Sequence, residues 1–407
     1  MLTLPLPGHG SPAPARSALT ASAATRRPDL DGLRGVAVLS LLAIHCVPVW
    51  SRGGVMAIDI FFVLSGFLTT VLVRRLLDEE RFSYPRFVQR RLARLAPAAL
   101  LVLVACLAFA VLFTPAAVAR DIGRQVAWAA SMLSDVRLAR SGASAPPHPN
   151  DPVLAFWAVG VVVQFALVWP LVLRAVRGTA ALRVVIVAGL AGSLAFDLAC
   201  AAQGSWLAYH LLAGRWWELM AGAALATLPA QGAAARPAAA SSAIARDVLS
   251  WSAPMLLASA ALTVDRASVL PGAWALLPVL AACLSIAAGP RASFNRHVLA
   301  QPVLRFYGLV AYPLALWHWA VLSFPVILEV TLSNEVRVLV LIAAIVLAAL
   351  TYELVEVPLR ARANASIHAA LALGGAIVVV GLLGALLAAL DGLPFTYPPA
   401  LRSASMP

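Results

Sequence analysis

The sequence contains no lysine and few charged residues of any kind. All 30 basic residues are arginine, and charged residues occupy only 12% of the 407 positions, against about 25% in soluble domains. Hydrophobic residues make up 62% of the chain, so too few charges remain to cover a water-exposed surface. The composition excludes a soluble globule and predicts an all-α, polytopic membrane protein.

Cysteine is also scarce, and its spacing excludes two further classes. The four cysteines stand singly in apolar segments, with no CxxC or CxxH pattern, so neither a disulfide framework nor a metal site is expected. The net charge of +12 could indicate a nucleic-acid partner. Because the arginines flank hydrophobic runs, we instead assign that charge to membrane topology and expect membrane lipid as the partner.

Eleven apolar runs predict a transmembrane helical bundle of about 10–11 spans with no soluble catalytic domain. The runs cover residues 31–50, 55–73, 96–114, 153–173, 183–201, 207–228, 249–264, 268–289, 306–329, 336–357 and 367–390. Residues 120–140 are expected to add an interfacial or re-entrant helix. We divide the chain into a disordered cytoplasmic tail (1–25), a ten-span domain (26–360) and an additional span with a short external tail (361–407).

The distribution of arginine predicts the orientation of these spans. With the N-terminus inside, 21 of the 30 arginines fall on the cytoplasmic side, 8 on the opposite side and one within a span. Positive charge favours the cytoplasmic side of a membrane. We therefore predict a cytoplasmic N-terminus and, because the span count is odd, an external C-terminus.

The first span carries two ionisable residues on one helix face. Arg34 and His45 are eleven residues apart, which is three helical turns plus about 20° and a rise of about 16 Å. This spacing suits a ligand with phosphates at one end, bound by the arginine, and a reactive group at the other, where the imidazole takes a proton. A snorkelling arginine and a histidine hydrogen-bonded across a helix interface would explain the same pair.

Other polar positions leave alternatives open. Asp59 could orient His45 or lie solvated at the outer surface, and Arg215 and Glu218 form an i,i+3 pair that would neutralise itself. His318, flanked by two tryptophans, fits packing or an interhelical hydrogen bond. The Ser65-Gly66 step favours close helix approach.

Several ordered motifs resemble the membrane-bound acyltransferase-3 family. They are Arg27-Pro28-Asp29-Leu30-Asp31-Gly32-Leu33-Arg34-Gly35 through His45, Gly53-Gly54, IDIFFVLSGFL at 58–68, FVQRRLARLAP at 87–97, LWHW at 316–319 and YELVEVPLR at 352–360. The resemblance implies an O-acyltransferase of a bacterial-type inner membrane that moves an acyl group, commonly acetyl, from acyl-CoA to a hydroxyl of a glycan, lipid-linked sugar or secondary metabolite. It implies that Arg34 and His45 are functional and that Arg91 and Arg94 match the family's Arg-x-x-Arg pair at the cytoplasmic mouth.

We accordingly assign His45, Arg34 and Asp59 as catalytic and Arg34, Arg91 and Arg94 as binding the acyl-CoA, with no metal. One departure from the family pattern lies at Val162 and Val163, where relatives carry an acidic pair. Its loss indicates an altered acceptor, a substitute acid elsewhere or lost activity. Two other functions therefore stay open: a multi-span transporter or flippase, and an inactive family member acting as a partner subunit.

Overall fold

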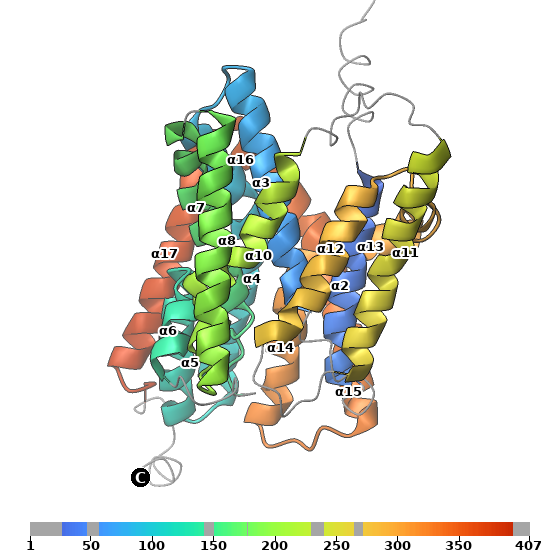
Figure 1. Cartoon of the computed structure of the whole chain (residues 1–407). Helices are drawn as coiled ribbons and strands as arrows, with labels where there is room; N and C mark the ends of the chain where they lie inside the picture. Colours follow the sequence, from blue (N-terminus) through green and yellow to red (C-terminus); the bar gives the residue numbers. More distant parts are fainter. Residues whose placement is uncertain are drawn as a thin grey trace, which may run out of the picture.

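The computed structural model describes residues 27–46, 57–141, 150–176, 178–228, 240–263 and 272–393, which form helices and turns with no strand. The helices run largely along one axis and form a bundle (Figure 1). They are α2 (Pro28–Cys46), α3 (Ala57–Asp78), α4 (Tyr84–Phe113), α5 (Ala116–Ala130), α6 (Ser134–Ser141), α7 (Phe156–Ala175), α8 (Thr179–Ala202), α9 (Leu207–His210), α10 (Leu212–Ala226), α11 (Ala240–Thr263), η2 (Gly272–Ala275), α12 (Leu276–Ala288), η3 (Asn295–Leu299), α13 (Pro302–Leu309), α14 (Ala311–Ile327), α15 (Asn334–Leu350), η4 (Thr351–Glu356), α16 (Val357–Ala365) and α17 (Ile367–Ala389).

The all-α membrane class is confirmed. Six helical segments of the described chain, one of them formed by α15, η4 and α16 together, are long and apolar enough to cross a bilayer, and the bent pair α13 and α14 forms either a broken span or a re-entrant loop. Four more helices lie in the same bundle: α10 and α12 have only 15 and 13 residues, α2 carries Asp29, Asp31 and Arg34, and α11 is rich in serine. Helix α2 begins at the upper end of the bundle in Figure 1 and α17 ends at the lower. The predicted tail (1–25) and the Gly53-Gly54 turn lie outside the described residues.

Several predicted spans differ from the helices observed. The run 306–329 is bent by 68° between α13 and α14, and the run 207–228 is broken between α9 and α10. The 120–140 segment forms two short helices, α5 and α6, rather than one. Helix α11 begins at Ala240, earlier than the predicted 249, because Ala and Ser extend a helix even where hydropathy is low.

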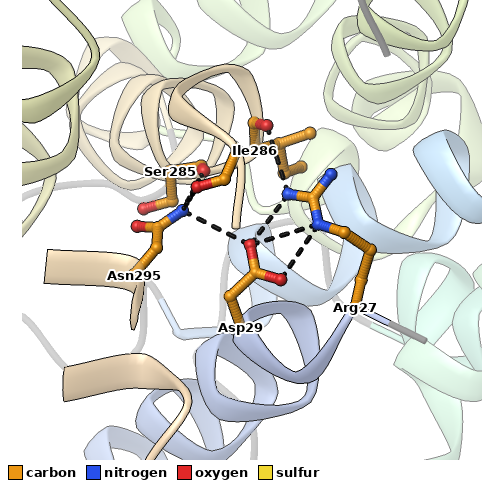
Figure 2. A network of polar contacts seen from close by, with 6 residues as sticks. Arg27, Asp29, Ser285, Ile286 and Asn295 are labelled. Atoms are coloured by element: carbon orange, nitrogen blue, oxygen red, sulfur yellow. Dashed lines mark hydrogen bonds and ion pairs between the residues drawn. The ribbon is translucent and has the colours of Figure 1, made fainter. Parts of the chain in front are cut away.

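A buried polar network fixes the start of α2 (Figure 2). Asp29, only 1% exposed, accepts hydrogen bonds from Arg27 at 2.8 and 2.9 Å and from the Asn295 side chain at 3.4 Å. Arg27 also donates to the carbonyl of Ile286 at 3.4 Å. A carboxylate in the first turn complements the helix dipole, and here it also ties α2 to α12 and η3.

Glycines bring α2 against the backbone of its neighbours. A Cβ on Gly32 would lie 1.7 Å from the carbonyl oxygen of Leu299, and one on Gly35 would lie 2.0 Å from that of Leu304. Both distances are far below van der Waals contact, so only glycine fits at these positions. Helix α2 is therefore held against η3 and α13 at closest backbone approach.

The same device joins α3 to α10. A Cβ on Gly66 would lie 1.9 Å from the carbonyl oxygen of Leu219, and one on Gly222 would lie 2.0 Å from that of Val63. The close helix approach predicted at Ser65-Gly66 is thus confirmed.

We expect Gly66→Ala to lower the melting temperature in detergent, because the added methyl group forces α3 and α10 apart at a cost of about 1–3 kcal/mol. Gly375→Ala in α17 is the control, since a Cβ there meets no atom within 4 Å and alanine raises helix propensity. Equal melting temperatures for the two variants would contradict the packing argument.

Candidate active site

Helix α2 carries the two ends of the candidate site. It runs without interruption from Pro28 to Cys46, so Arg34 and His45 lie on one rigid element, about 16 Å apart along its axis. This arrangement agrees with the spacing argument made from the sequence.

Three arginines gather near the start of α2, and we call Arg34, Arg91 and Arg94 the arginine cluster. Arg94 is close enough to both Arg34 and Arg91 for their charges to repel. Arg91 donates a 2.5 Å hydrogen bond to the hydroxyl of Thr69 in α3. The structure therefore brings together the three residues that the sequence assigned to the phosphates of the donor.

This cluster is only partly neutralised. Arg34 forms a 2.9 Å ion pair with Asp31, and among the described residues neither Arg91 nor Arg94 forms one. Glu356 of η4 lies within range of the Arg94 charge. The cluster thus keeps an excess of positive charge at one end of α2, where guanidinium groups are suited to bind phosphate.

The other end of α2 meets α14. The ring centroid of His45 lies 5.3 Å from that of His318 and 5.0 Å from that of Trp319. We call His45 and His318 the histidine pair. His45 is partly buried, whereas His318 is 5% exposed. The sequence spacing contained no signal for this contact, since it depends on how two distant helices pack.

The ring protons of the pair can be assigned from its hydrogen bonds. Nδ1 of His45 lies 2.9 Å from the carbonyl oxygen of Leu41, and Nδ1 of His318 lies 3.2 Å from that of Leu314. A carbonyl oxygen only accepts, so in the neutral rings Nδ1 carries the proton and Nε2 holds a lone pair. Each Nε2 is therefore a base.

Asp59 lies in a separate buried ion cluster. Arg215 donates to Asp59 at 3.1 Å and to Glu218 at 2.5 Å, and all three residues are at most 2% exposed. The guanidinium also lies over the rings of Tyr209 and Trp157, at 4.8 and 5.7 Å from their centroids. The predicted Arg215–Glu218 pairing is confirmed, while the role of Asp59 beside His45 stays a prediction.

A carboxylate that the sequence analysis missed lies against α7. Asp135 of α6 accepts hydrogen bonds from the Gln164 amide at 2.9 Å to each of its oxygens. Burial raises the pKa of Asp135, and the hydrogen bonds from Gln164 oppose that rise. An acid from α6 thus lies close to the α7 segment that holds Val162 and Val163.

A further contact connects the histidine pair to the segment before α7. The indole of Trp319 donates to the carbonyl oxygen of Asp151 at 2.7 Å, and the Asp151 side chain forms an ion pair with Arg137 of α6. No group of three or more His, Cys, Asp or Glu side chains in the described part of the chain is arranged to hold a metal ion.

Known proteins share the segments that build this site. A sequence model of the acyltransferase-3 family, described as an acyltransferase domain, matches residues 27–353. Peptidoglycan O-acetyltransferase OatA of Listeria monocytogenes is 25% identical over 360 residues, which cover 82% of this chain and 56% of that protein. O-acetyltransferase OatA of Staphylococcus aureus is 24% identical over 352 residues, covering 82% and 57%. No solved structure matches.

This chain spans just over half the length of these two relatives. The family match includes all of α2, α4 and α14, which carry the arginine cluster and the histidine pair, and stops before α17. Because the match covers four fifths of the sequence, the protein belongs to the acyltransferase-3 family.

Proposed function

We propose that this protein is an integral-membrane O-acyltransferase that moves an acyl group, acetyl in the first instance, from cytoplasmic acyl-CoA to a hydroxyl of a carbohydrate acceptor. One observation carries the proposal. Helix α2 contributes Arg34 to the partly neutralised arginine cluster near its start and His45 to the histidine pair at its end. The N-terminus is then cytoplasmic and the C-terminus external, as the arginine distribution favours.

The arginine cluster is the donor site in this proposal. Coenzyme A carries its phosphates at one end and the thioester at the other, joined by an extended pantetheine arm. Arg34, Arg91 and Arg94 bind the phosphates, and the arm runs along α2 toward His45. The donor phosphates are attracted to the three guanidinium groups and also relieve the repulsion among them. Both effects stabilise the bound donor.

His45 is the general base. Its Nε2 accepts the proton of the acceptor hydroxyl as that oxygen attacks the thioester carbonyl carbon. The new C–O bond forms, the C–S bond breaks, and the electron pair leaves with sulfur. The proton then passes to the thiolate and gives free coenzyme A.

The acceptor is a glycan or lipid-linked sugar reached from the far side of the membrane. The printed names of both relatives describe O-acetyltransferases, and one names peptidoglycan as the substrate, which supports a cell-wall glycan here. The second candidate is an inactive partner subunit, favoured by Val162 and Val163. Asp135 weakens that candidate, because it supplies a carboxylate beside the same helix.

We expect His45→Ala to abolish transfer from radiolabelled acetyl-CoA in purified protein, since general bases contribute about 10²–10⁴-fold to rate. The melting temperature should stay near that of the unmodified protein, because the close backbone contacts at Gly32 and Gly35 hold α2 in place and do not involve this side chain. His368→Ala, at an exposed histidine of α17, is the control and should keep full activity. Retained transfer in His45→Ala would remove the base from the mechanism.

Arg34→Ala and Arg91→Ala should each raise the KM for acetyl-CoA by about 10–100-fold, the value of one charge-assisted hydrogen bond, and leave the KM for the acceptor unchanged. Arg90→Ala removes the same charge from an exposed position on the same helix, so it controls for net charge. If Arg90→Ala raises the donor KM as much as Arg91→Ala, the arginines act through surface potential rather than as a site.

Asp59→Asn separates its two possible roles. Because the carboxylate compensates buried Arg215, its loss should lower stability by up to about 3–5 kcal/mol, measured as a lower melting temperature. A direct role at His45 predicts instead a lower kcat at an unchanged melting temperature. Glu218→Gln is the matched comparison, since Glu218 also pairs with Arg215.

A further inference from the structure

One buried ring nitrogen of His318 makes no hydrogen bond within the described part of the chain. The side chain is 5% exposed, and its Nε2 has no hydrogen-bond partner among the described residues. Since Nδ1 carries the proton, Nε2 holds a lone pair that can accept a hydrogen bond or a proton. An unpaired buried acceptor costs about 1–3 kcal/mol. Such a group is retained where a proton or a donor occupies it at some stage.

Among the described aromatic rings, that of His45 lies nearest to the ring of His318. His318 lies within charge range of His45, and the centroid distance of 5.3 Å is one that a direct hydrogen bond or a single bridging hydroxyl can span. In the neutral state Nε2 of His318 accepts no hydrogen bond within the described part of the chain, so it can take up a proton that reaches the pair.

The charged groups packed around the pair are engaged elsewhere. Arg337 at the start of α15 donates to the backbone carbonyl of His45 at 3.0 Å. Asp151 is paired with Arg137 and reaches α14 through its carbonyl oxygen, which accepts from Trp319. None of these described contacts uses Nε2 of His318.

We infer that His318 shares with His45 the proton taken from the acceptor hydroxyl, so that the two imidazoles act as one base. This rests on the acyl transfer proposed above. When the hydroxyl loses its proton, the proton lies between the two Nε2 atoms as the oxygen bonds to the thioester carbon and the thiolate leaves. The pair then returns the proton to sulfur, and both rings are neutral again. Sharing stabilises the imidazolium as a carboxylate would, without adding a buried negative charge.

The first test does not require activity. In full-length protein labelled with ¹⁵N-histidine in detergent, the two rings should titrate as a coupled unit. His318→Gln removes one titrating member and should move the pH midpoint of His45 by about one unit. Ser323→Ala is the control, since Ser323 is buried in the same helix and its hydroxyl donates to the Trp319 carbonyl oxygen. An unchanged His45 titration in His318→Gln overturns the inference.

The second test measures transfer. His318→Gln should lower kcat about 10²-fold while both KM values stay within about twofold of the unmodified protein. In His318→Gly, added imidazole should restore transfer, whereas pyrazole, which has the same shape but is a much weaker base, should not. Equal rescue by the two compounds would show that His318 only fills space.

The two tests separate this inference from the function on which it rests. Coupled titration without acetyl transfer in the unmodified protein leaves the histidine pair in place and contradicts the acyltransferase proposal. Transfer with independent titration of the two rings, or with full kcat in His318→Gln, contradicts the shared proton and leaves the acyltransferase proposal standing.

Discussion

Close backbone contact through glycine is the constraint on which the candidate site depends. Lipid supplies little hydrophobic force between helices, so association relies on close packing. Helix α2 reaches that packing at Gly32 and Gly35, and a Cβ on Gly308 of α13 would lie 1.8 Å from the carbonyl oxygen of Asp31. Because α2 carries both Arg34 and His45, the contacts that fix the position of this helix also fix where both residues lie.

The buried charge of Arg215 is fully neutralised, whereas the charge of the arginine cluster is only partly neutralised. Arg215 is 1% exposed and has two carboxylates within hydrogen-bond distance, as an ion deep in an apolar interior requires. Arg34 has an 18% exposed side chain, forms an ion pair with a single carboxylate, and has Arg91 and Arg94 as like-charged neighbours. Partial exposure makes that excess charge tolerable. Binding an anion would therefore stabilise the arginine cluster.

Contacts within one helix could be predicted from the sequence, and contacts between helices could not. Helical periodicity places Arg34 and His45 on one face and makes Arg215 and Glu218 neighbours, because both statements depend only on local spacing. The pairing of Asp59 with Arg215 joins residues 156 positions apart, and the contact of His45 with His318 joins two helices that are far apart in the sequence. Hydropathy also predicted a single span over residues 306–329, where a bend separates α13 from α14. Hydropathy depends on composition and contains no information on the direction of the helix axis.

The missing acidic pair of α7 illustrates the same limit. Val162 and Val163 leave α7 without a carboxylate of its own, yet Asp135 reaches the helix from α6. Gln164 satisfies both oxygens of that carboxylate with a neutral amide, whereas Asp59 and Asp151 are matched by arginines. Asp135 forms no ion pair within the described part of the chain. Because α6 places a carboxylate beside α7, the change to Val162 and Val163 alone is no argument for lost activity.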